Sequence, residues 1–210
     1  IGIKSAVGEL EFWKTLARRM RERGEGPDFI AIDGGEGGTG AAPLEFSDSL
    51  GVPLREALLL VHNALVGIGV RDDLCIAASG KRASSYEIAT AMALGADWCN
   101  IARGFMFSIG CIQSQSCHTN KCPVGVATQD QRLQEALAVE DKAQRACNFH
   151  KNTVQGLADM TAACGLGHPN EFTPRHLCER ISPHEVWSFK QLYHFFEPGQ
   201  LLENNAGPVL

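Results

Sequence analysis

The stretch DLCIAASGK at residues 73–81 contains the pattern that decides the fold. Its apolar core is short and almost continuous, which is typical of a strand buried on both faces of a parallel sheet. The strand ends in a small SGK turn, and Ser84 follows as a favourable N-cap for a helix that reaches about Leu94. Residues 73–94 therefore predict one strand followed by one helix.

The same alternation recurs on both sides of this unit. Strands are predicted over 1–6, 28–33, 73–78 and 97–102, with helices over 9–23 and 54–67. Strands that alternate with helices build parallel sheets, either an open doubly wound sheet or a (β/α)8 barrel of the TIM type. The sequence thus predicts an α/β protein that binds ligands at the carboxyl ends of its strands.

Each predicted strand ends in an unusual sequence. Lys4 ends the first strand, DGGEGGTG (33–40) ends the second, SGKR (79–82) the third and ARG (102–104) the fourth. Because the carboxyl ends of parallel strands meet at one edge of the sheet, these segments should form one functional face. A lysine at the mouth of the sheet is costly unless it meets a ligand or a carboxylate, and an ordinary salt-bridged lysine is the alternative.

The glycine-rich loop predicts a close contact between the backbone and a ligand. Five glycines occur within residues 34–40, and glycine allows conformations and approaches that other residues block. The exposed N–H groups suit a phosphate or a flat ring system. The G-x-G-x-x-G spacing from Gly35 to Gly40 also invites a dinucleotide-binding interpretation, but no helix follows directly. A flexible surface loop is the remaining alternative.

Positive side chains follow two consecutive strands. Lys81 comes after Ser79 and Gly80, and Arg103 precedes Gly104, in each case just before a predicted helix. A cation beside a helix N-terminus neutralises a phosphate, and (β/α) barrels often bind phosphate with the loops after their last two strands. These segments favour a phosphate site over solvated surface charges.

Three of the eight cysteines lie close together, at Cys111, Cys117 and Cys122, and Pro123 follows the last of them. Thiolates at such spacings can hold one iron–sulfur cluster, and a proline after the last cysteine recurs in ferredoxin-type loops. Three ligands suit a three-iron cluster, or a four-iron cluster with one open position. A zinc site with His118 and three unrelated core thiols are the alternatives.

Composition limits the possible functions. The chain has 210 residues, of which 44% are hydrophobic and 20% charged, and its net charge is −5. Such a chain is globular, and a broad nucleic-acid-binding surface is not expected. No apolar run is long enough for a bilayer, and no secretory signal is visible, so a cytoplasmic protein is expected. His62 lies among apolar residues and is predicted to be a core or interface histidine.

The last third of the chain shows a different pattern. A long helical stretch is predicted over 129–164, with one break near Val139. A short helix is predicted over 172–181, after a Gly- and Pro-containing loop, and residues 183–210 are expected to form a packing tail.

Several motifs together resemble the FMN-binding synthase domain of glutamate synthase, specifically its C-terminal half. The motifs are IK at 3–4, GGEGGTGAAP at 34–43, Gly51, Pro53, Val61 and His62, SGK at 79–81, AMALGAD at 91–97 and IGCIQSQSCHTNKCPVGVATQ at 109–129. The resemblance covers about residues 1–165, and the cysteine loop is its most specific part.

The resemblance implies a (β/α)8 barrel with FMN and a 3Fe-4S cluster, of which this chain holds the last four βα units. It implies half of the barrel at 1–110, the cluster loop at 111–128, and a helical extension and tail at 129–210. The implied cluster ligands are Cys111, Cys117 and Cys122. The implied flavin contacts are Gly37, Gly38, Ser79, Gly80, Lys81, Arg103 and Gly104, with Lys4 and Glu36 as catalytic residues.

The implied reaction condenses 2-oxoglutarate with ammonia, or with an amine derived from glutamine, and reduces the resulting imine to glutamate. The implied partners are an electron-donor subunit or ferredoxin, a glutaminase domain or subunit, and the remaining half of the barrel. This chain alone is expected to have little or no activity. The alternatives are an iron–sulfur electron-transfer or assembly module, and a phosphate-binding barrel of the IMP dehydrogenase type with Cys111 as nucleophile.

Overall fold

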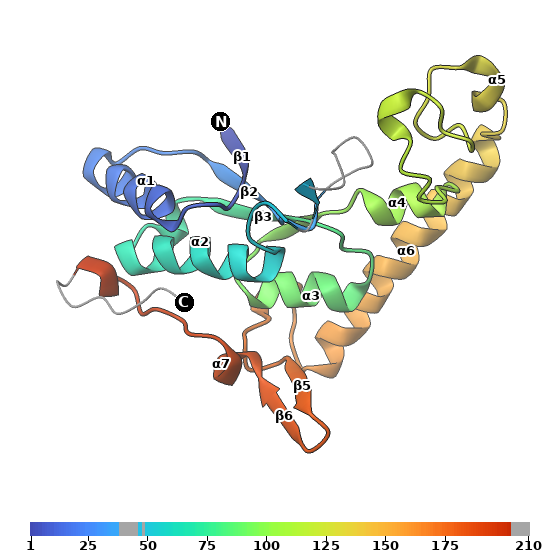
Figure 1. Cartoon of the computed structure of the whole chain (residues 1–210). Coiled ribbons are helices and arrows are strands. Elements are labelled where there is room, and N and C mark those ends of the chain that lie inside the picture. Colours follow the sequence, from blue (N-terminus) through green and yellow to red (C-terminus); the bar gives the residue numbers. More distant parts are fainter. Residues whose placement is uncertain (38–45, 48, 203–210) are drawn as a thin grey trace.

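A four-stranded parallel sheet forms the centre of the computed structural model, which describes residues 1–37, 46–47 and 49–202 (Figure 1). The strands, in spatial and sequence order, are β1 (Gly2–Ala6), β2 (Phe29–Asp33), β3 (Cys75–Ser79) and β4 (Trp98–Asn100). Their register places Ala31 between Lys4 and Ala77. The predicted α/β class and its four strand and helix units are confirmed.

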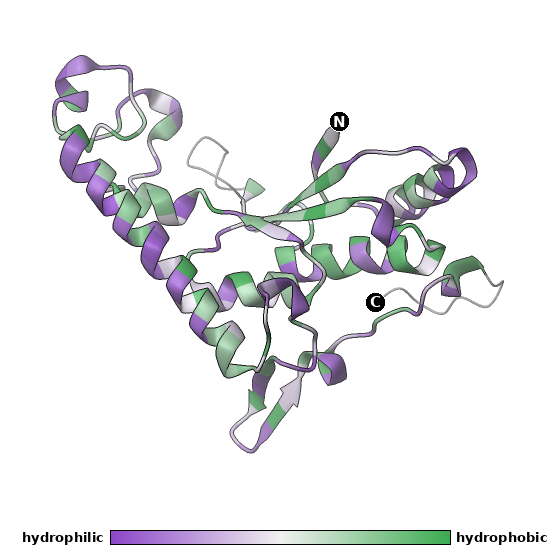
Figure 2. Cartoon of the chain, turned by 180° about the vertical axis from the view of Figure 1, so that it is seen from behind, coloured by the Kyte–Doolittle hydropathy of each residue, from purple (hydrophilic) through white to green (hydrophobic). Residues whose placement is uncertain are grey.

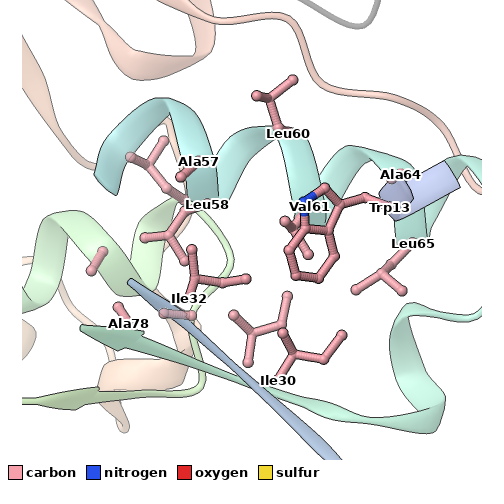
Figure 3. Packing of buried hydrophobic residues seen from close by; sticks show 14 of the residues in the cluster. Trp13, Ile30, Ile32, Ala57, Leu58, Leu60, Val61, Ala64, Leu65 and Ala78 are labelled. Atoms are coloured by element: carbon pink, nitrogen blue, oxygen red, sulfur yellow. The ribbon is translucent and has the colours of Figure 1, made fainter. Parts of the chain in front are cut away.

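Three helices cover one face of this sheet. They are α1 (Leu10–Arg23), α2 (Leu54–Ile68) and α3 (Ser85–Ala93). The isoleucines of β2 and β3 that face the helices are fully buried, and they pack against α1 and α2 with Trp13 among them (Figure 3). Local signals set the helix ends: Gly24 adopts φ 65° after α1, and Ser84 with Glu87 forms a capping box before α3.

The other face of the sheet is largely uncovered. Phe29 and Trp98 are each 39% exposed there, and their ring centroids lie 5.9 Å apart. Gly2 leaves room for the Phe29 ring, which a β-carbon at that position would overlap. Within the described residues no strand pairs with the outer edges of β1 or β4, so the sheet is a curved half and not a closed barrel.

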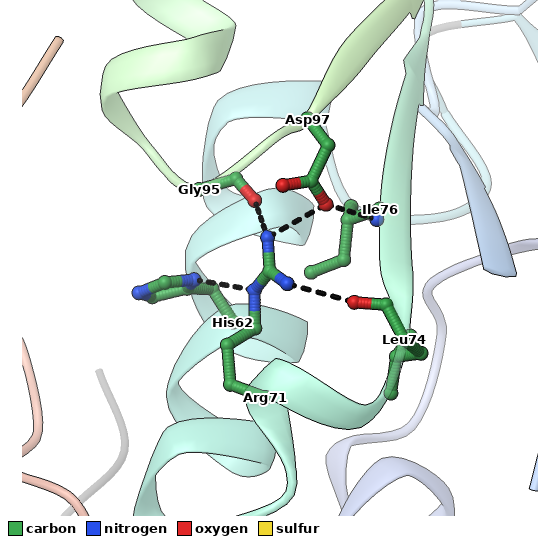
Figure 4. Close-up of polar contacts among 6 residues, drawn as sticks. All are labelled: His62, Arg71, Leu74, Ile76, Gly95 and Asp97. Carbon is green, nitrogen blue, oxygen red and sulfur yellow. Dashed lines mark hydrogen bonds and ion pairs between the residues drawn. The ribbon is translucent and has the colours of Figure 1, made fainter. Parts of the chain in front are cut away.

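An arginine network closes the amino end of the sheet (Figure 4). Arg71, in the short 3-10 helix η2 (Arg71–Asp73), donates hydrogen bonds to the carbonyls of Leu74 and Gly95 at 3.0 and 2.8 Å. It also pairs with Asp97 at 2.8 Å, and the same carboxylate oxygen accepts the N–H of Ile76 at 2.6 Å. The network therefore joins the turns that lead into β3 and β4.

His62 completes this network from α2. The Arg71 Nε atom lies 3.4 Å from His62 Nδ1. Burial, together with the positive charge of Arg71, lowers the pKa of His62 to about 4 against the opposing effect of Asp97 and Asp72. The imidazole is therefore neutral at pH 7 and accepts a hydrogen bond, which agrees with the predicted core histidine.

The chain leaves the sheet through α4 (Arg103–Ser108) and a long cysteine-containing loop. The loop includes η3 (Cys117–Thr119) and α5 (Gln131–Gln134), and it lies at one end of α6 (Val139–Ala163). The predicted break is confirmed, because α6 begins at Val139. This helix packs against α3 and α4, while polar residues occur along most of its length (Figure 2). No described helix combines the length and apolarity needed to span a membrane.

The helix predicted over 172–181 is wrong. The structure has η4 (Pro169–Glu171), an antiparallel hairpin of β5 (Cys178–Ser182) and β6 (Glu185–Ser188), then α7 (Phe189–Leu192) and η5 (Gln200–Leu202). Pro174 interrupts the helical pattern, and its carbonyl accepts the N–H of Lys190. Phe189 of α7 is fully buried in the core. The segment 172–181 therefore bonds to α7 and does not form the hydrogen bonds of a helix of its own.

Candidate functional site

A cavity of about 250 Å³ opens at the carboxyl ends of the strands. Its lining includes Asp33, Gly34, Gly35, Gly37, Ser79, Gly80, Lys81, Arg82, Asn100 and Arg103. Five of the predicted flavin contacts thus lie around one space, although they come from three separate loops. Gly38 lies outside the described residues. The predicted functional face at this end of the sheet therefore corresponds to a real cavity.

Two positions around this cavity require glycine, one because of close packing and the other because of its backbone conformation. A β-carbon on Gly35 would lie 2.4 Å from the Gly51 carbonyl oxygen, so no larger residue fits there. Gly37 adopts φ 76°, a conformation that favours glycine. The described part of the glycine-rich loop, which ends at Gly37, is thus shaped by local constraints and also lies beside the cavity.

Three cations line the cavity: Lys81, Arg82 and Arg103. Arg82 is only 8% exposed, and its buried Nε atom has no hydrogen-bond partner among the described residues. A buried guanidinium donor without a partner is costly, and an anion in the cavity would satisfy it. Arg82 is therefore not a solvated surface charge, and that alternative is wrong for this residue. Although Arg82 stands in the SGKR segment, it was not among the predicted flavin contacts.

Polar side chains at the strand ends complete the lining. The register aligns Ala6 with Asp33, Asp33 with Ser79, and Ser79 with Asn100. Lys4 lies in the middle of β1, not at its end, and its ammonium forms an ion pair with Asp33. The Lys4 side chain is 60% exposed on the open face, so the pair borders the cavity from the side of the sheet that the helices leave uncovered.

Glu36 and Gly104 lie beside the cavity and not in its lining. Both Glu36 carboxylate oxygens accept the N–H of Leu54, at 3.0 and 3.1 Å, and so cap the N-terminus of α2. A β-carbon on Gly104 would lie 2.6 Å from the Phe149 ring, so this glycine allows α4 to pack closely on α6. A catalytic role for Glu36 and a flavin contact for Gly104 stay predictions.

The three clustered cysteines line a second cavity, together with Arg103 and Met106. Cys122 is 3% exposed. Burial raises the pKa of Cys122, but hydrogen bonds from the backbone N–H groups of residues 124–127 outweigh it and hold the pKa below its ordinary value. Such N–H donors stabilise a thiolate, which is the form that binds iron.

The cysteine loop has an unusual backbone. Gln113, Gln115 and Asn120 all adopt positive φ values, 55°, 55° and 61°, which non-glycine residues rarely do. The Asn120 side-chain oxygen accepts the N–H of Gln129 at 2.6 Å and so ties the middle of the loop to its C-terminal end. Strained residues of this kind concentrate at functional sites.

The donor chemistry of this loop fits an iron–sulfur cluster. Within the described ranges, no three His, Cys, Asp or Glu side chains converge closely enough for a single metal ion. In a cluster with three ligands each thiolate binds a different iron, so thiols spread around a shared cavity suit it. The three thiols and the N–H groups at Cys122 would hold such a group.

The chain is an α/β protein with an open parallel sheet, a cavity lined by three cations at the carboxyl ends of the strands, and a cysteine loop that follows. The family described as a conserved region in glutamate synthase matches residues 16–167. The chain belongs to the glutamate synthase family.

Two relatives agree with this assignment. The glutamate synthase large subunit-like protein YerD of Bacillus subtilis is 45% identical over 196 residues, which are 93% of this chain and 37% of that protein. An archaeal-type glutamate synthase [NADPH] of Thermotoga maritima is 36% identical over 141 residues, which are 67% of this chain and 28% of that protein. The chain thus spans about a third of the length of these relatives.

Solved structures show weaker similarity. The nitroalkane oxidase of Streptomyces ansochromogenes gives a TM-score of 0.43 at 16% identity and covers 77% of this chain and 58% of its own. A mutant flavocytochrome b2 with pyruvate bound gives a TM-score of 0.43 at 14% identity and covers 94% of this chain and 44% of its own.

Proposed function

We propose that this chain is the C-terminal half of the FMN-binding barrel of a glutamate synthase-like oxidoreductase. The observation that carries the proposal is the cavity at the carboxyl ends of the strands, where Lys81, Arg82 and Arg103 meet beside the cysteine cavity. FMN, once reduced by two electrons, would supply the hydride that reduces the imine of 2-oxoglutarate to glutamate. The imine itself forms when ammonia adds to the keto group and water leaves.

The chain's own residues would bind the flavin and the keto acid. Lys81, Arg82 and Arg103 would hold the flavin phosphate, because guanidinium and ammonium groups bind phosphate oxygens by charge-assisted hydrogen bonds. Ser79 and Gly80 would contact the flavin at the end of β3. Gly37 and Gly38 would bring the backbone close to the ring system.

Lys4 and Glu36, the two residues predicted to be catalytic, would act in different ways. Lys4 would face the substrate from the open side of the sheet, where its ammonium can hold a carboxylate of the keto acid after exchange with Asp33. Glu36 would act indirectly, since its carboxylate caps α2 and thereby orders the glycine-rich loop next to the cavity. Both roles rest on the family assignment together with these contacts.

Cys111, Cys117 and Cys122 would hold the 3Fe-4S cluster, through which electrons would arrive from a donor subunit or from ferredoxin. The shared cavity and the N–H donors around Cys122 support this role. The ammonia would come from a glutaminase domain or subunit.

The remaining half of the barrel would cover the open face of the sheet. Two observations support this proposal: Phe29 and Trp98 are exposed, and the outer edges of β1 and β4 have no partner strand among the described residues. Open strand edges normally pair with another strand, and exposed apolar faces are normally covered. The barrel interior would then be completed by strands that this chain does not contain. This chain alone would show little turnover.

Visible spectra and assays test the proposal. Anaerobically purified protein should show flavin bands together with broad iron–sulfur absorption, and glutamate should form from ammonia, 2-oxoglutarate and a reductant only after the barrel half is added. Iron–sulfur absorption without flavin would support an electron-transfer module instead. Robust turnover by this chain alone would contradict the half-barrel proposal.

A further inference from the structure

Arg103 is the only described residue that lines both the strand-end cavity and the cysteine cavity. It is the first residue of α4 and directly follows the turn after β4. Lys81 and Arg82 line the first cavity alone, and the three cysteines line the second alone. Arg103 thus lines two cavities, of which the proposed function assigns the first to FMN and the second to the iron–sulfur cluster.

The backbone around Arg103 is held firmly in place. Gly104 packs against the Phe149 ring of α6, and Phe105 meets the same ring edge-on at a centroid distance of 5.0 Å. The N–H of Cys111 donates to the carbonyl of Met106 at 2.9 Å, so the first cysteine is fixed to the same short helix. Movement of α4 would therefore displace Arg103 and Cys111 together.

The Arg103 side chain also has a preferred direction. Its guanidinium carbon lies 6.0 Å from the centroid of the Phe107 ring, one turn further along α4. This contact aligns the side chain with the helix that leads toward the cysteine loop. Arg103 is partly exposed, and its guanidinium has a defined neighbour on α4 while the residue lines both cavities.

We propose that Arg103 is a positioning residue that electrostatically couples the flavin phosphate to the iron–sulfur cluster; this inference rests on the proposed function. A phosphate monoester carries a charge between −1 and −2 at pH 7. A cluster held by three thiolates is also negative, and gains one more negative charge on reduction. A guanidinium shared by both groups binds the phosphate and stabilises the reduced cluster.

The test measures two quantities in the same holoprotein, assembled with its barrel half: the dissociation constant of FMN and the reduction potential of the cluster, followed by electron paramagnetic resonance. Arg103→Gln should weaken FMN at least tenfold and make cluster reduction about tenfold less favourable, or about 59 mV for a one-electron couple. Arg103→Lys, which retains the charge, should restore most of the potential and only part of the FMN affinity.

Two matched variants isolate the shared cation. Lys81→Gln removes a charge from the strand-end cavity alone, so it should weaken FMN and leave the cluster potential unchanged. Lys142→Gln removes a charge whose Nζ lies beside Gly110 in the cysteine loop but which lines neither cavity, so it should change neither quantity by as much as Arg103→Gln.

The outcomes are distinct. If the wild-type protein binds neither flavin nor cluster, the proposed function fails and this inference fails with it. If the wild-type protein binds both, but Arg103→Gln changes only one of the two quantities, the coupling is overturned while the proposed function stands. Circular dichroism of each variant confirms that the fold is retained.

Discussion

At the amino end of the sheet Arg71 donates hydrogen bonds to Leu74 and Gly95 and pairs with Asp97, whereas at the carboxyl end Arg82 keeps a buried Nε without a partner. Both arginines are withdrawn from solvent, with the Arg71 side chain 16% exposed and Arg82 8% exposed. The difference lies in what each one contacts. The hydrogen bonds of Arg71 stabilise the fold, whereas the buried Nε–H of Arg82 is available to an anion, even though the charge of Arg82 also lowers the pKa of Glu87.

The same contrast extends to the residues around each arginine. The amino end supplies Asp97 and a neutral His62, so the charge of Arg71 is balanced within the protein. The carboxyl end gathers Lys81, Arg82 and Arg103 around an open cavity, with Asp33 engaged by Lys4. The described residues thus place a balanced arginine network at one end of the sheet and a cation-lined cavity at the other, which is the end where (β/α) barrels bind their ligands.

The largest expected effect concerns the cysteine loop that continues from the carboxyl end. Cys122→Ser should abolish the broad iron–sulfur absorption, because a hydroxyl is a poor ligand for iron and the N–H groups around residue 122 would lose their thiolate. Cys164→Ser, at an exposed cysteine just after α6, is the matched control and should keep the absorption. Persistence of the absorption in Cys122→Ser would show that Cys122 is not a ligand.

The next effect tests the amino end alone. Arg71→Gln should lower the free energy of unfolding by about 3 kcal/mol, because it leaves the Asp97 carboxylate without its cation and several carbonyls without their donor. Urea-induced unfolding followed by circular dichroism measures this change. FMN affinity of the folded variant should stay within twofold, and a large loss of affinity would mean that the two ends are not independent.

The sequence predicted the four strand and helix units because short apolar runs and Gly or Ser signals are local. It did not predict the burial of Arg82, since the unpaired Nε depends on the neighbouring loops that enclose it. Lys4 was placed at a strand end, although the strand itself was predicted over 1–6, and β1 does continue to Ala6. The burial of Arg82 concerns tertiary contacts, which no local pattern specifies.

The same reasoning explains the C-terminal error. Residues 172–181 have helical spacing, but their backbone groups bond to α7 and to β6, which lie later in the chain. The cysteine spacing predicted a shared site, and the three thiols do line one cavity, but their role as cluster ligands stays a prediction. The backbone strain of the cysteine loop at Gln113, Gln115 and Asn120 could not be read from the residue types.

A smaller effect tests the carboxyl end with the same chemical change. Arg82→Gln should weaken FMN about 30-fold, equivalent to about 2 kcal/mol, because a charge-assisted contact with the phosphate is lost. The free energy of unfolding should fall by less than about 1 kcal/mol, since the Nε atom makes no hydrogen bond to lose. Fluorescence titration of FMN and urea unfolding measure the two quantities. A stability loss as large as that of Arg71→Gln would remove the contrast between the two arginines.

The smallest effect is the acid sensitivity of the amino end. Unfolding returns the pKa of His62 from about 4 to its ordinary value of 6.5. Between these values the unfolded chain binds more protons than the folded one, so stability falls as the pH is lowered. From pH 7 to pH 5.5 this group should contribute a loss of about 1 kcal/mol.

His62→Gln isolates this contribution, because glutamine keeps a polar side chain but does not titrate. The quantity to compare is the change in the free energy of unfolding between pH 7 and pH 5.5, which removes any constant cost of the substitution. The wild-type protein should lose about 1 kcal/mol more than the variant over this interval. Equal losses would mean that His62 takes up its proton over the same pH range in the folded and the unfolded chain, so that burial and Arg71 do not keep it neutral at the amino end.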